Sequence, residues 1–128
     1  MSYTIDKRLT NTTLEEADTR TREALKEQGF GVLTEIDVQG TMKKKLDADM
    51  PGYLILGACN PKMAHQAIQL EPNVGAMLPC NVILRQDGSD ILVCAIDPEA
   101  SMTAIDNPQL KSVAGEVRDM LAKAIDAL

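Results

Sequence analysis

The stretch that decides the fold runs from Tyr53 to Leu84, YLILGACNPKMAHQAIQLEPNVGAMLPCNVIL. Its first six residues, 53–58, are apolar without polar alternation. Such a run predicts a strand that is buried on both faces, or on one face plus a subunit contact. Asn60-Pro61 then predicts the start of a helix, with asparagine as the cap and proline at the first helical position. A second apolar strand follows at residues 82–84, so the stretch predicts a strand–helix–strand unit.

The rest of the chain adds elements on both sides of this unit. Alternation and helical spacing predict strands at residues 3–8, 30–38 and 91–96, and helices at 14–28, at 42–46 and from Asn107-Pro108 onward. The order β-α-β-(short α)-β-α-β-β-α indicates an α+β fold with a mostly antiparallel sheet. We expect one domain over residues 1–128, with the first and last helices packed on one face of the sheet.

Composition excludes several classes of partner. The net charge of −6 argues against a nucleic-acid backbone, and an aromatic content of 2% leaves few side chains on which bases stack. No apolar run reaches the roughly 20 residues of a membrane span, and the first residues lack an apolar signal core. Three cysteines, an odd number, indicate free thiols in a reducing compartment. We therefore expect a cytoplasmic protein without a membrane or nucleic-acid partner.

Three motifs resemble one known family. The segments LGACNP (56–61), LPCNV (78–82) and AIDP (95–98), with GFGVLTEID upstream, are similar to the domain of unknown function 302 (DUF302) family. The resemblance covers nearly the whole chain. It implies a β-α-β4-α fold like that of the TATA-binding protein, and a homodimer. It implies no activity, and the acidic charge opposes DNA binding by this fold relative.

Polar and reactive side chains border the two apolar strands. Cys59-Asn60 ends the first strand, and Cys80-Asn81 begins the second. If these strands pair antiparallel, both borders lie at one edge of the sheet, and the hairpin that follows returns Asp97 to the same edge. His65 lies one helical turn beyond the first pair. A parallel arrangement would instead place the two cysteines at opposite ends.

Three chemical hypotheses follow from this convergence. Cys59, near a helix N-terminus, would have a lowered pKa and act as a reactive or redox thiol, with His65 nearby. Cys59, His65 and Cys80 would bind a soft or borderline metal such as zinc. Free amides at the helix start would hold a small anion that Asn60 and Asn81 orient. The structural alternative is that both cysteines are inert packing residues, as Cys94 is expected to be.

No nucleophile elbow, phosphate loop or dinucleotide glycine pattern is present, so the sequence predicts neither an enzyme class nor a cofactor. Our leading hypothesis is a small cytoplasmic homodimer that binds a small ligand, anion or metal. Its predicted site comprises Cys59, Asn60, His65, Cys80, Asn81 and Asp97. The alternatives are a thiol-dependent enzyme or redox protein that uses Cys59, and a purely structural or interaction domain.

Overall fold

One five-stranded sheet forms the centre of the structure, a computed structural model that describes residues 2–128. Its strands lie in the order β1-β5-β4-β3-β2, and every neighbouring pair is antiparallel. They are β1 (Thr4–Leu9), β2 (Gly31–Asp37), β3 (Tyr53–Cys59), β4 (Cys80–Asp87) and β5 (Asp90–Ile96). The predicted α+β fold with an antiparallel sheet is confirmed.

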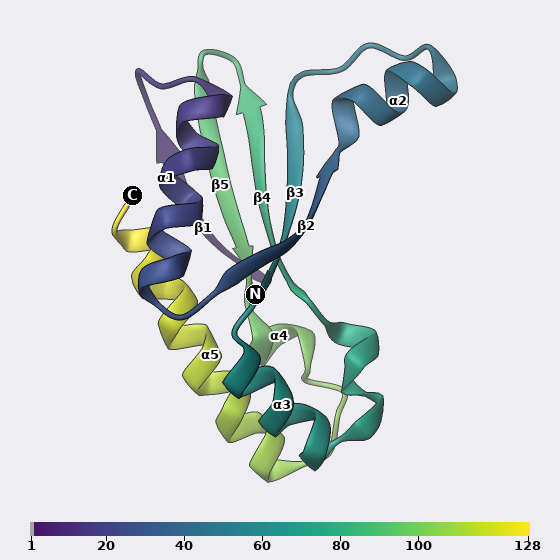
Figure 1. Cartoon of the computed structure of the whole chain (residues 1–128), viewed down its shortest axis with the longest axis vertical. Coiled ribbons are helices and arrows are strands. Elements are labelled where there is room, and N and C mark those ends of the chain that lie inside the picture. The colour runs from purple at the N-terminus through teal and green to yellow at the C-terminus, as the bar shows by residue number, and fades with distance from the viewer. Residues whose placement is uncertain (1) are drawn as a thin grey trace.

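The helices lie on one face and at both ends of this sheet. They are α1 (Leu14–Glu27), α2 (Val38–Leu46), α3 (Pro61–Leu70), the 3-10 helix η1 (Pro72–Met77), α4 (Pro98–Ser101) and α5 (Pro108–Asp126). The first and last helices, α1 and α5, cover the same face, as predicted (Figure 1). Helices α3 and α4 gather where β3 ends and β4 begins, and α2 projects at the opposite end (Figure 1). No helix within residues 2–128 combines the length and apolarity that crossing a membrane requires.

Capping side chains set the helix boundaries. Asn60 and Asn107 cap α3 and α5, as the sequence predicts, and the proline that follows each occupies the first helical turn. Several predicted boundaries differ from the structure, among them the start of α2, which was expected at Met42. Val38 was expected to end the second strand, but the Asp37 carboxylate accepts a hydrogen bond of 3.0 Å from the Gly40 amide. This cap starts α2 at Val38, so the strand ends one residue earlier.

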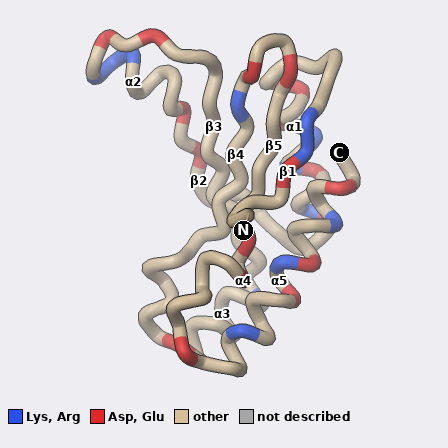
Figure 2. The backbone as a smooth tube through the Cα atoms, turned by 180° about the vertical axis from the view of Figure 1, so that it is seen from behind, with Lys and Arg blue, Asp and Glu red and all other residues tan. Residues whose placement is uncertain are grey.

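The hydrophobic core lies between the sheet and the pair α1 and α5. Along β4, Val82 and Leu84 are fully buried, whereas Ile83 and Arg85 are only partly buried. The fully buried residues of the neighbouring strands are Leu56, Ala58, Ile91, Val93 and Ala95. Seen from behind, the strands lie in front of α1 and α5 (Figure 2). The helices therefore bury one face of the sheet and leave the other, here called the open face, without a helical layer.

Two leucines test where the core lies. Leu84 is fully buried, whereas Leu46 on α2 is 70% exposed. Leu84→Ala should lower the free energy of unfolding by about 2–5 kcal/mol, because it removes buried apolar area and leaves a cavity. Leu46→Ala makes the same chemical change on the surface, and surface substitutions usually stay within about 0.5 kcal/mol. Urea denaturation of both variants checks this, and equal losses would contradict the placement of the core.

Candidate functional site

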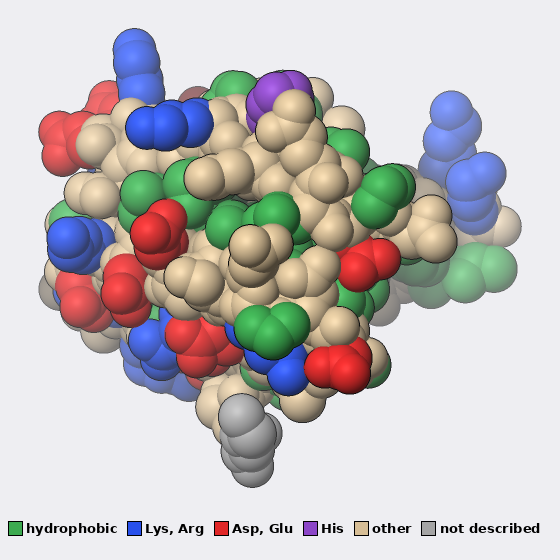
Figure 3. Space-filling model, turned by 90° about the horizontal axis from the view of Figure 1, so that it is seen from below, with side chains coloured by type: hydrophobic (Ala, Val, Ile, Leu, Met, Phe, Trp, Pro, Cys, Tyr) green, Lys and Arg blue, Asp and Glu red, His purple; other side chains and the backbone are tan. Residues whose placement is uncertain are grey.

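An apolar cavity of about 330 Å³ lies at the end of the sheet where α3 and α4 gather. Its walls come from several elements that are far apart in the sequence. They include Cys59 and Cys80 from the strand ends, Met63 and Ala67 from α3, and Val113 and Val117 from α5. Figure 3 looks at this end of the molecule, where hydrophobic side chains are visible at the centre among polar and charged ones. The cavity is thus open to solvent at a surface where apolar and polar side chains are mixed (Figure 3).

The antiparallel pairing of β3 with β4 creates this arrangement. Ala58 lies opposite Cys80, and Gly57 lies opposite Asn81. Two neighbouring residues approach Gly57 so closely that this position has no room for a side chain. A Cβ atom there would clash with the Thr34 hydroxyl and would lie 2.9 Å from Cγ of Pro79. The two Cys-Asn borders therefore lie together at one end of the sheet, as predicted. Pro79 packs against Gly57 of the neighbouring strand.

Asn60 holds three helices together beside the cavity. Its Oδ1 accepts a hydrogen bond of 3.3 Å from the Met63 amide, which caps α3. Its Nδ2 donates to the Gln28 carbonyl at the end of α1 and lies 3.6 Å from the Met120 sulfur of α5. Gly29 makes room for this amide: its φ is +85°, and a Cβ atom would lie 3.1 Å from Nδ2. Asn60 lines the cavity, but these contacts already engage both ends of its amide.

The two cysteines at the cavity are not both activated thiols. Cys80 is buried, and burial together with the neighbouring Cys59 raises its pKa to about 11. Burial disfavours the charged form of a thiol, so Cys80 does not have the character of an activated thiol. Cys59 is half-buried. Cys94 is buried as predicted, and burial with the adjacent Asp6 raises its pKa to about 11 as well.

Three predicted site residues lie away from the cavity. His65 is exposed on α3 and does not line it, so the predicted Cys59–His65 pair is not assembled there. Asn81 follows Cys80 in the strand and so points to the opposite, open face, where it lines a shallow hollow with Ile83 and Arg85. Asp97 is engaged elsewhere.

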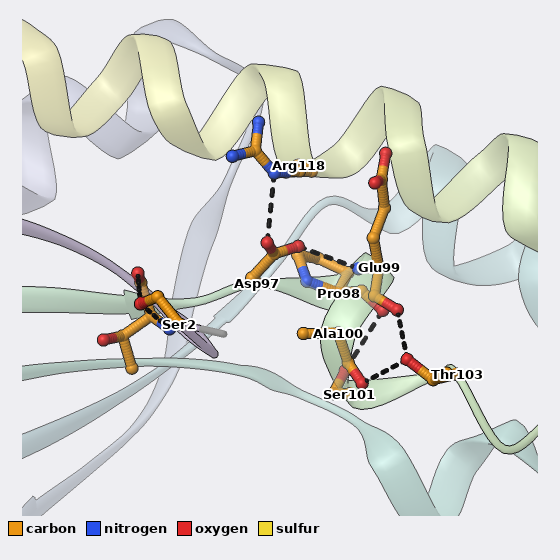
Figure 4. Close-up of polar contacts among 9 residues, drawn as sticks. Ser2, Asp97, Pro98, Glu99, Ala100, Ser101, Thr103 and Arg118 are labelled. Atoms are coloured by element: carbon orange, nitrogen blue, oxygen red, sulfur yellow. Dashed lines mark hydrogen bonds and ion pairs between the residues drawn. The ribbon is translucent and has the colours of Figure 1, made fainter.

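Asp97 joins α4 to α5. Its Oδ2 accepts from Arg118 Nε at 3.1 Å, and its Oδ1 accepts from the Glu99 amide at 3.0 Å, which caps α4 (Figure 4). Only 13% of the Asp97 side chain is exposed. Its carboxylate is thus a helix cap and an ion-pair partner, while the next residue, Pro98, lines the cavity.

The predicted metal set is not brought together either. Within residues 2–128, no three His, Cys, Asp or Glu side chains are placed so that they could hold a metal ion. Cys59 and Cys80 share the cavity wall, but His65 is outside it. His65, the nitrogen ligand of the zinc hypothesis, is therefore not placed with the two cysteines.

Sequence reasoning missed most of the cavity wall. Val113, Ala114 and Val117 belong to the apolar stripe of α5, which the sequence marks as core. Met63 and Met102 also line the cavity, and methionine is a side chain that commonly fills gaps in a core. Hydrophobic periodicity cannot separate a residue that fills the core from one that borders a cavity, because both require the same side chains.

The fold and site define a small α+β domain: an antiparallel sheet covered on one face by two helices, with an apolar cavity at its end. The family model described as "Domain of unknown function DUF302" matches residues 5–128, so the chain belongs to this family. The solved structures include the crystal structure of an uncharacterized conserved DUF302 protein from Bacillus stearothermophilus, with a TM-score of 0.92 and 27% sequence identity over 98% of both chains. No curated protein matches the sequence.

The raised pKa of Cys80 predicts slow alkylation. At pH 8 about one Cys80 side chain in a thousand would be a thiolate, and the thiolate is the nucleophile. In native protein treated with iodoacetamide, peptide mass spectrometry should find Cys80 modified far more slowly than in urea, where burial is lost. Equal rates for Cys80 in native and unfolded protein would contradict the buried, neutral thiol.

Proposed function

We propose that this protein binds a small apolar molecule in the cavity beside Cys59 and Cys80. The observation that carries the proposal is the cavity itself: about 330 Å³, open to solvent and lined almost entirely by hydrocarbon and sulfur groups. Small-molecule sites commonly fall between about 300 and 1,000 Å³ and are mostly apolar. An ionic ligand would lose its hydration there without gaining a counter-charge, so a neutral, apolar ligand suits the cavity best.

The exposed side chains around the cavity favour the same ligand class. Leu33 and Ile68 line the cavity although they are 68% and 44% exposed, and Met77, which precedes the lining residue Leu78, is 41% exposed. Exposed apolar side chains that cluster beside a pocket often mark a binding surface. Here they extend the apolar surface outward, which would assist the entry of a poorly soluble molecule.

We further propose that two copies associate through the open face of the sheet. This face presents the partly buried apolar side chains Tyr53, Ile55, Ile83, Leu92 and Ile96, whereas α1 and α5 lie on the opposite face (Figure 1). Contiguous apolar surface of this kind is typical of subunit interfaces. A homodimer would cover the open face. The cavity, which lies at the end of the sheet, would remain free for ligand.

The compartment proposed for this dimer is the cytoplasm. Cys59, Cys80 and Cys94 are all free thiols. Unpaired cysteines persist in a reducing environment, whereas an oxidising one promotes disulfide formation.

Binding of the neutral dye N-phenyl-1-naphthylamine tests the cavity. The dye should fluoresce on binding to the native protein, and Ala64→Phe should weaken its affinity about tenfold or more, equivalent to about 1.4 kcal/mol, because the ring fills the cavity. Gln66→Phe is the matched control, since it adds the same ring to the exposed side of the same helix. If both variants bind the dye like the parent protein, the cavity is not the site.

Sedimentation equilibrium tests the dimer. The protein should sediment as a dimer at micromolar concentration. Ile83→Asp should sediment as a monomer, because dimerisation would bury its unpaired carboxylate in the interface. Leu46→Asp places the same charge on α2, at a side chain that is 70% exposed, and should leave the dimer intact. A parent protein that sediments as a monomer would refute the proposal.

A further inference from the structure

Exposure separates the mouth of the cavity from its inner wall. Among the lining residues that the structure describes, three are exposed: Leu33 of β2, Ile68 of α3 and Gly75 of η1. The lining residues contributed by α5 are all buried; they are Leu110, Val113, Ala114 and Val117. The cavity therefore opens to solvent between β2, α3 and η1, and α5 forms its inner wall.

A β-bulge brings Leu33 to this mouth. Val32 pairs with Ala58, and the next pair in the register joins Thr34 to Gly57. Leu33 is therefore an extra residue without a partner in β3. Such a bulge bends the strand and redirects a side chain, and bulges are common next to active sites. As a result, Leu33 lines the cavity although it is 68% exposed, and its apolar surface lies where a bound molecule would leave the cavity.

The mouth and the inner wall are both uncharged. No Asp, Glu, Lys, Arg or His among residues 2–128 lines the cavity, and the amide of Asn60 already donates and accepts hydrogen bonds within the protein. At Gly75 a Cβ atom would meet no other atom within 4 Å, so the mouth is unobstructed there. A hydrocarbon chain would thus contact apolar groups from α5 to the mouth, whereas a polar group is better hydrated outside.

We propose that the ligand is a single-chain amphiphile. Its hydrocarbon chain fills the cavity from α5 outward, contacts Leu33 at the mouth and leaves a polar head group in solvent. This inference rests on the proposed binding of an apolar molecule and adds the shape and orientation of that molecule. It is supported by the opening to solvent and by the apolar surface that continues past the mouth over Leu33 and Ile68. A rounded molecule enclosed by the cavity would leave both side chains in water.

Straight-chain alcohols from hexanol to dodecanol test the contact with Leu33. Each alcohol competes with N-phenyl-1-naphthylamine, and its affinity should rise up to about fourfold with each added methylene group that is buried. Leu33→Ala should weaken dodecanol binding about fivefold but leave hexanol binding unchanged, because only the longer chain reaches the mouth. Ile36→Ala is the matched control, since Ile36 lies on the same strand, is 48% exposed and does not line the cavity. It should bind both alcohols like the parent protein.

A diol tests the orientation of the chain. The diol with a hydroxyl group at each end of the dodecyl chain should bind about tenfold or more weakly than dodecanol, because one hydroxyl would be buried without a hydrogen-bond partner. Equal affinities for the two would overturn the proposal. So would a Leu33→Ala variant that binds dodecanol like the parent protein, or that loses affinity for hexanol and dodecanol alike.

The effect of Ala64→Phe on dye binding separates the two levels of the proposal. If Ala64→Phe weakens dye binding while Leu33→Ala leaves dodecanol binding unchanged, the cavity is a binding site and only the amphiphile inference fails. If Ala64→Phe has no effect on the dye, the proposed function fails and the inference fails with it.

Discussion

The antiparallel pairing of β3 with β4 is the constraint on which the cavity depends. It places Ala58 opposite Cys80, so the end of one strand and the start of the other meet at a single edge. The helix α3 must leave this edge and return to it through η1, which leaves space between α3, α5 and the strand ends. A register shift of one residue would turn Cys80 to the open face and remove it from the cavity wall.

The one-sided distribution of helices explains both proposed surfaces. Because α1 and α5 lie on the same face, the central strands bury Leu56, Leu84 and Val93 completely. The alternate side chains, such as Ile83 and Leu92, face away from these helices and remain partly exposed. The same pattern that stabilises the core thus leaves the apolar surface on which the proposed dimer depends, while the cavity lies at the sheet end and not on that surface.

Local patterns in the sequence were sufficient to predict the fold class and part of the site. The asparagine–proline caps and apolar strand runs are short-range signals, and they placed Cys59, Asn60 and Cys80 at one edge. Asn81 was also predicted at the site, but it lines the hollow on the open face, because neighbouring residues in a strand point to opposite faces. The ion pair of Asp97 with Arg118 could not be predicted, since it joins segments that no local pattern relates.

The cavity itself lay beyond prediction from the sequence. Its existence depends on how closely α3, α4 and α5 approach one another, which is a property of tertiary packing. Met63, Val113 and Val117 have the composition expected of a filled core, and nothing in their spacing indicates that space remains between them. Gly57 was the one local signal, because a glycine within an apolar strand indicates a close approach, here by Thr34 and Pro79.

Methyl NMR of the protein with N-phenyl-1-naphthylamine tests most directly whether the cavity is the binding site. With methionine, valine and isoleucine methyl groups labelled, the dye should shift the signals of Met63, Val113 and Val117, which line the cavity. The signal of Ile83 on the open face should remain unchanged. Shifts at Ile83 with unchanged signals from the three cavity residues would contradict the account.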